Sequence, residues 1–171
     1  MFAEGDLIIY GGEGVCRVEK IGIPAISGVD RSRQYYCLSP LYRTGKVFTP
    51  VDTKVRMRPV LDRKAALALI RQIPDMKAEV APIQNVRALK EYYQTAVSTC
   101  VCEDLVKLIK TAYGKRQHAL ETGRKVSQID ERYLKRAEEQ LYGELAVALD
   151  MQRDEVPGYI EETISSAEGA E

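Results

Sequence analysis

The spacing of the apolar residues changes character near residue 60. Before that point the chain has short apolar runs, rich in valine and isoleucine, separated by turn residues roughly every eight to twelve positions. After it, apolar residues recur at the three- and four-residue intervals of an amphipathic helix. The pattern predicts an α+β fold, with a small, strongly curved antiparallel β-barrel at the N-terminus followed by an all-α helical C-terminal domain.

Five strands are expected in the first part, at residues 6–10, 15–21, 34–38, 46–51 and 55–60. Gly11, Gly12 and Gly14 lie between the first two strands and are typical of a tight connection. They do not form a dinucleotide-binding fingerprint, because Arg17 stands where its last glycine belongs and no helical pattern follows. Pro50 favours an edge position for the fourth strand, because proline donates no ladder hydrogen bond.

Helices are expected at residues 63–73, 86–98, 103–121 and 127–149, and in a last short segment near the C-terminus. Asp62 and Asp154 are the expected N-caps of the first and last of these. Ser127 and Asp130 have the spacing of a weak capping box. The predicted organisation is a barrel over 1–60, a helix and connection over 61–82, a helical domain over 83–165 and a frayed acidic tail over 166–171.

The net charge is zero, but the charges are unevenly distributed along the chain. Residues 82–125 hold eight basic and four acidic side chains, whereas residues 126–171 hold four basic and twelve acidic ones. A basic middle of this kind can neutralise a short track of phosphates. On spacing alone, an ordinary solvated helix surface explains it equally well.

No catalytic, metal or cofactor site is expected. His118 is the single histidine, so no triad can be assembled. Cys100 and Cys102 are one residue apart, which is a poor spacing for structural zinc, and the four cysteines are expected to be reduced thiols. No leader segment or membrane-spanning run is recognisable, and a cytoplasmic protein is expected.

Several motifs occur in a characteristic order. They are Phe2-x-x-Gly5-Asp6-x-x-Ile9-Tyr10-Gly11-Gly12-x-Gly14-Val15, Tyr36-Cys37-Leu38, Thr49-Pro50-Val51-Asp52, Met57-Arg58-Pro59-Val60, Asp104–Tyr113, Ser127-x-x-Asp130-x-x-x-Leu134 and Leu141-Tyr142-Gly143-Glu144-Leu145-Ala146. With these motifs the chain resembles the CarD/CdnL family of bacterial transcription regulators over nearly its whole length. The resemblance implies a Tudor-like barrel that binds the β subunit of RNA polymerase, a module shared with the transcription-repair coupling factor.

The resemblance also implies a monomeric, non-catalytic protein whose helical domain stabilises the promoter open complex. That domain would contact DNA without sequence specificity near the upstream edge of the bubble. The polymerase-binding residues carried over are Ile23, Ile26, Lys46, Val47, Phe48, Thr49 and Pro50. The DNA-binding residues expected from the resemblance and the basic middle are Ile83, Asn85, Val86, Arg87, Lys90, Lys115, Arg124, Lys125 and Arg132.

Two departures from the family pattern keep a second hypothesis open. The family's DNA-facing domain typically begins with a tryptophan that wedges into the minor groove, but this chain contains no tryptophan. Phe48 also stands near the place where the polymerase-facing strand often has an arginine. The alternative is a polymerase-tethered protein–protein adaptor with little or no DNA contact.

Overall fold

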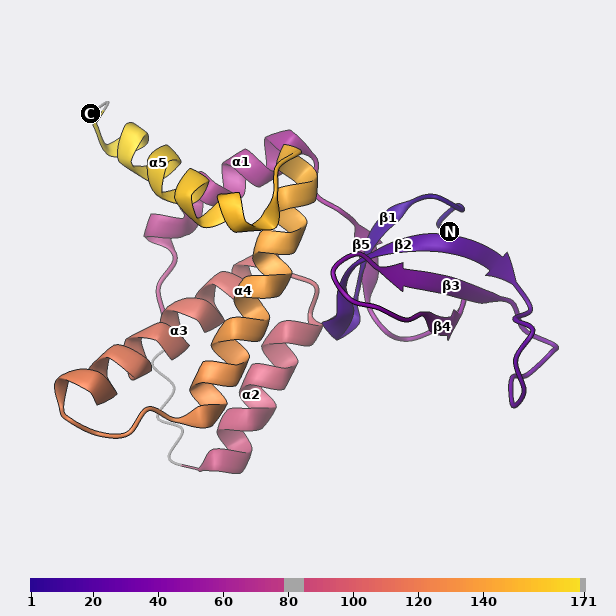
Figure 1. Ribbon diagram of the computed structural model, residues 1–171, viewed down its shortest axis with the longest axis horizontal. Coiled ribbons are helices and arrows are strands. Elements are labelled where there is room, and N and C mark those ends of the chain that lie inside the picture. The colour runs from indigo at the N-terminus through magenta and orange to yellow at the C-terminus, as the bar shows by residue number, and fades with distance from the viewer. Residues whose placement is uncertain (79–84, 170–171) are drawn as a thin grey trace.

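The computed structural model describes residues 1–78 and 85–169. Figure 1 shows a sheet beside a bundle of helices, which we call the sheet domain (residues 1–60) and the helical domain (residues 61–169). The described residues form five strands and five α-helices. The predicted order, strands first and helices after them, is confirmed.

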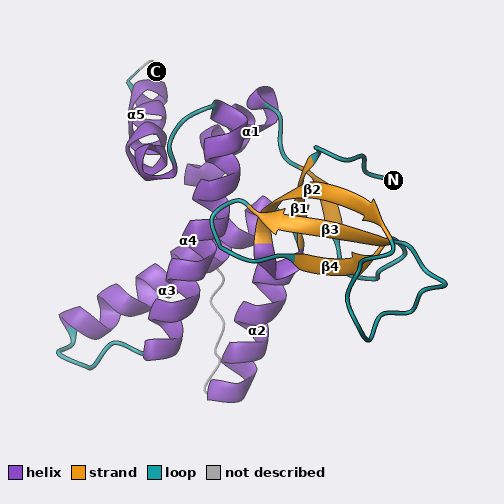
Figure 2. Cartoon of the chain, turned by 45° about the vertical axis from the view of Figure 1, so that its right-hand side comes forward, coloured by secondary structure: helices purple, strands orange, loops and turns teal. Residues whose placement is uncertain are grey.

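The sheet domain is an antiparallel sheet with the strand order β4-β3-β2-β1-β5. Its strands are β1 (Leu7–Tyr10), β2 (Gly14–Gly22), β3 (Tyr35–Pro40), β4 (Val47–Pro50) and β5 (Met57–Pro59). One face buries apolar side chains: Ile8, Cys16, Val18, Tyr36 and Leu38. The pairings of the described residues do not join β4 to β5, so these two strands are the edges of the sheet. Figure 2 shows β4 beside β3 as the outermost labelled strand.

The connection between β1 and β2 is a single 3₁₀ turn, Gly11–Glu13. Gly11 has φ +39° and Gly14 has φ +80°, a left-handed backbone that other residues rarely adopt. The glycine cluster therefore forms the expected tight connection between two paired strands.

The helical domain consists of α1 (Arg63–Gln72), α2 (Val86–Ser98), α3 (Cys102–Glu121), α4 (Gln128–Leu149) and α5 (Val156–Glu168). Their apolar faces share one core, to which α1 contributes Ala66, Leu69 and Ile70. Asp62 caps α1 as expected, by accepting a hydrogen bond from the backbone N–H of Ala65 at 2.7 Å. Among the described residues, no helix is long and apolar enough to cross a membrane.

The ends of α4 and α5 differ from the sequence-based expectations. Ser127 makes no side-chain cap hydrogen bond, and the Asp130 carboxylate accepts a hydrogen bond from Tyr93 in the helical core. Before α5, Gln152 and Glu155 form the capping box, and the Asp154 side chain is not the cap. Helix α5 continues to Glu168, three residues beyond the predicted end of the helical domain at residue 165.

Candidate functional site

Strand β4 presents a sheet edge to solvent. The backbone N–H of Val51 donates to the carbonyl oxygen of Gln34 at 3.0 Å, and Phe48 lies opposite Cys37. Backbone groups of an antiparallel strand face a given neighbour at every second residue, so the N–H and C=O of Phe48 point away from β3. Pro50 occupies the other outward position, where its missing N–H interrupts no ladder. The edge can therefore pair with one more strand from a partner.

The surface beside this edge is apolar. Exposed fractions are 37% for Phe48, 53% for Ile23 and 41% for Ile26. A hollow of about 150 Å³ lies between Ile23, Tyr35 and Phe48. It lies on the side of the sheet opposite the buried cluster, because Tyr36 between Tyr35 and Cys37 points into that cluster.

Not every residue expected on this surface is accessible. Thr49 is 3% exposed, and its hydroxyl accepts a hydrogen bond from the Tyr10 hydroxyl at 3.3 Å. Val47 packs partly against the buried cluster of the sheet. Lys46 is exposed. Val47 and Thr49 face inward, so a partner strand could contact their backbone but little of their side chains.

The expected DNA-binding residues lie at the end of the helical domain that points away from the sheet. Figure 1 shows that α2 begins there and that the connection from α3 to α4 lies there too. We call this region the distal end, and its exposed expected residues are Asn85, Val86, Arg87, Lys90, Lys115, Arg124, Lys125 and Arg132. Ile83 lies outside the described residues. Val86 is 64% exposed and begins α2, which Asn85 caps by accepting from Arg87 N at 2.9 Å.

Two of the distal cations already have carboxylate partners. Lys115 Nζ donates to Asp130 Oδ1 at 3.1 Å, and the Tyr93 hydroxyl donates to the same oxygen at 2.6 Å. Burial, followed by the hydrogen bond to Asp130, raises the pKa of Tyr93. Arg87 pairs loosely with Glu91 at 3.8 Å in full solvent, a contact of little energetic weight. Lys115 is thus tied to the helical core, whereas Arg87 remains accessible.

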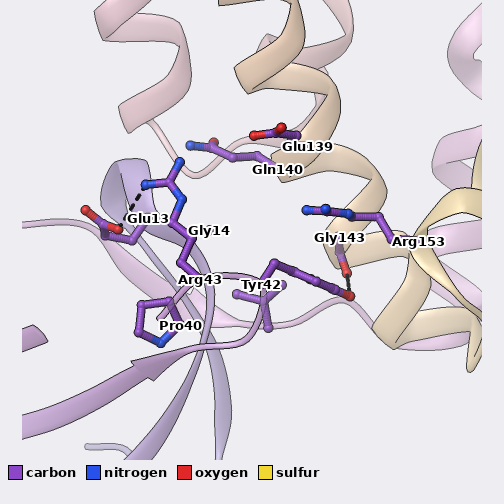
Figure 3. A pocket seen from close by; sticks show the side chains of 10 residues that line it. Glu13, Gly14, Pro40, Tyr42, Arg43, Glu139, Gln140, Gly143 and Arg153 are labelled. Carbon is purple, nitrogen blue, oxygen red and sulfur yellow. Dashed lines mark hydrogen bonds and ion pairs between the residues drawn. The ribbon is translucent and has the colours of Figure 1, made fainter. Parts of the chain in front are cut away.

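A second hollow, about 240 Å³, lies between the two domains (Figure 3). The Tyr42 hydroxyl donates to the Gly143 carbonyl at 2.9 Å, and the Arg153 guanidinium lies 4.6 Å from the centroid of the Tyr42 ring. Arg43 Nη1 donates to Glu13 Oε2 at 3.4 Å. Burial raises the pKa of Tyr42, partly offset by the positive charge of Arg153. We interpret this hollow as part of the contact between the domains, because Tyr42 of the sheet domain already contacts both Gly143 and Arg153 of the helical domain there.

Sequence reasoning misses the ion pair between Arg58 and Glu144, the most buried one among the described residues. The two residues are 86 positions apart, and both lie inside motifs that carry the family resemblance. That location was the only signal available. Within the described residues, no group of three or more His, Cys, Asp or Glu side chains is arranged to hold a metal ion.

Comparison with known proteins identifies the sheet domain but not the rest. Residues 2–61 match the family model of the CarD-like/TRCF RID domain. The match spans all five strands and ends before α1. No curated protein matches the chain.

Proposed function

We propose that the chain is a transcription regulator of the promoter open complex, on the premise that residues 2–61, which match the CarD-like/TRCF RID domain, interact with RNA polymerase. Strand β4 and the neighbouring loop with Ile23 and Ile26 bind the β subunit of bacterial RNA polymerase. The distal end of the helical domain contacts promoter DNA near the upstream edge of the bubble. No bond is made or broken in this activity.

The outward backbone of β4 is the observation that carries the polymerase half of the proposal. The Phe48 N–H and C=O point away from β3 and are available to an added strand, and the apolar side chains of Phe48, Ile23 and Ile26 lie beside that edge. Main-chain pairing supplies affinity in such a contact, and the adjoining apolar surface supplies selectivity.

Exposed basic side chains support the DNA half. Lys90, Arg124 and Lys125 are solvent-exposed at one end of the helical domain, and the described residues include no carboxylate within ion-pair distance of these three. Phosphate contacts of this kind fix position without reading sequence. Val86 is the exposed apolar residue at the start of α2, and its small side chain makes a weaker wedge than an aromatic one.

Promoter-opening kinetics with purified polymerase test the proposal directly. The dissociation rate of open complexes, measured with a competitor that traps free polymerase, should fall when the full chain is added. A chain that binds the β subunit but leaves this rate unchanged would contradict the open-complex role.

The adaptor alternative draws on two observations. The chain has no tryptophan, and residues 126–171 carry an excess of acidic side chains that repel DNA. An adaptor would bind polymerase and recruit a protein through the helical domain. Added salt separates the two cases, because DNA contacts weaken steeply with salt concentration whereas mainly apolar protein contacts do not.

A further inference from the structure

The two domains meet at a buried carboxylate. Glu144 of α4 is 1% exposed and accepts hydrogen bonds from Arg58 Nη1 at 2.5 Å and Nη2 at 2.8 Å. It also accepts from the backbone N–H of Leu61 at 3.0 Å and from the Cys102 thiol at 3.2 Å. Strand β5, the segment leading to α1, the start of α3 and the C-terminal part of α4 therefore converge on one side chain. We call this arrangement the Glu144 hub.

A second contact lies on the β1–β2 turn and β3 side of the sheet. The Gly12 carbonyl accepts from Gln140 Nε2 at 2.6 Å and from Arg136 Nη2 at 3.3 Å. A Cβ atom at Gly12 would lie 2.6 Å from that guanidinium, and one at Gly143 would lie 2.7 Å from the Tyr42 ring. Glycine at these two positions allows the close approach of the domains, part of which is visible in Figure 3.

Apolar side chains fill the space between these polar contacts. Ile9 and Val15 of the sheet form a buried cluster with Cys100, and Val60 and Val147 pack against it. Cys100 has φ +61°, an uncommon backbone for a non-glycine residue. Its carbonyl accepts from Arg58 Nε at 2.5 Å, so the hub also holds this turn.

We propose that the Glu144 hub and the Gly12 contact lock the two domains in one orientation, with Arg58 and Glu144 as positioning residues. The connection from β5 to α1 is only residues 60–62, and the hub binds its backbone at Leu61. The lock holds β4 and the distal end at a fixed separation and angle. The consequence of this for binding rests on the proposed function, which assigns polymerase to β4 and DNA to the distal end. A partner bound at β4 then presents its DNA to a pre-positioned basic surface, which raises the effective concentration of the second contact.

Residual dipolar couplings of the full chain measure the orientation without reference to function. Backbone N–H couplings from β1–β5 and from α1–α5, fitted separately, should give the same alignment tensor in magnitude, rhombicity and direction. Tensors of different magnitude for the two domains would overturn the proposal.

Two variants test the residues. Arg58→Met with Glu144→Met replaces the ion pair with flexible apolar side chains and leaves no unpaired buried charge. Gly12→Leu with Gly143→Leu inserts side chains where Arg136 and Tyr42 now lie, and leaves the hub itself intact. Each should give two different tensors, and Arg71→Met, at an exposed position of α1, should give one. A single shared tensor in both variants would overturn the positioning role.

Function provides an independent readout. Both variants should bind the isolated β subunit as the unchanged chain does, while their affinity for the polymerase–promoter complex falls by roughly tenfold or more. A loss of β-subunit binding in both would contradict a purely orienting role. If the unchanged chain has one tensor but no effect on open complexes, the proposed function fails and the lock stands. If the chain has separate tensors but full activity, the proposed function stands and the lock fails.

Discussion

At the scale of single residues, loss of Arg58 should be costly for stability because its partner Glu144 is buried. Arg58→Met alone leaves the Glu144 carboxylate buried without its cation. The free energy of unfolding in urea should fall by about 3–5 kcal/mol, and adding Glu144→Met should recover most of that loss. The exposed control Arg71→Met should change it by less than about 0.5 kcal/mol. Equal losses for the single and double variants would contradict the account of the hub.

Buried thiols and phenols make the fold sensitive to alkaline pH. Burial raises the pKa of Cys16 to about 12, and burial, then Glu138 and Glu161, raises that of Tyr142 to about 12. The unfolded chain loses these protons at lower pH than the folded chain, so stability is complete below the unfolded pKa and falls as pH rises toward 12. Unfolding free energies from urea titrations at pH 8 and pH 10.5 should show the decline. Cys16→Ala should decline less between the same two pH values; an equal decline would contradict the assignment.

At the scale of elements, Phe48 allows the β4 edge to be tested without disturbing the sheet core. Phe48→Asp places a desolvated charge at the proposed contact and should weaken β-subunit binding by more than tenfold in a titration. Val101→Asp is a matched control, because Val101 is 38% exposed and Phe48 37%. Val47→Arg is a poorer test, since Val47 packs against the buried cluster of the sheet. Undiminished binding of Phe48→Asp would rule out this edge.

The distal end predicts a change in salt dependence. Replacing Lys90, Arg124 and Lys125 with alanine should weaken binding to duplex DNA and reduce the slope of log K against log salt by about 0.9 for each lost phosphate contact. The matched control removes Lys64, Arg71 and Lys77, exposed cations in and just after α1. Equal effects of the two triple variants would favour non-specific attraction over a defined surface.

Lys115→Ala should instead lower stability, because it leaves buried Asp130 without its cation.

Element identity was largely predictable, because it depends on local spacing. The short β-branched run of β2 and the 3.6-residue period of α4 are visible in the sequence, and so is the edge position implied by Pro50. The partners of polar side chains were not predictable. The sequence predicts Lys115 as a free cation and Asp130 as a capping residue. In the fold, α3 and α4 bring these two side chains together, which local spacing does not report.

At the scale of the whole molecule, the contact between domains could not be derived from the sequence. Gly12, taken alone, suits a tight turn, and its second role depends on Gln140 and Arg136, more than 120 residues away. Glu144 lies in a helical stripe where a charged residue ordinarily faces solvent, and only the folded chain gives it four donors. Long-range polar contacts leave no local periodicity, so sequence patterns cannot report them.

This contact predicts that the two domains unfold together. Separating them would expose Ile9 and Val15 and leave the Glu144 carboxylate without Arg58, so a state with one domain folded is disfavoured. In a urea titration followed by two-dimensional NMR, amide signals from β1–β5 and from α2–α4 should disappear with the same midpoint. Arg58→Met alone should separate the midpoints, because the unpaired Glu144 carboxylate regains water when the domains part. Two well-separated midpoints in the unchanged chain would mean that the interface contributes little to stability, and the lock would then have no energetic basis.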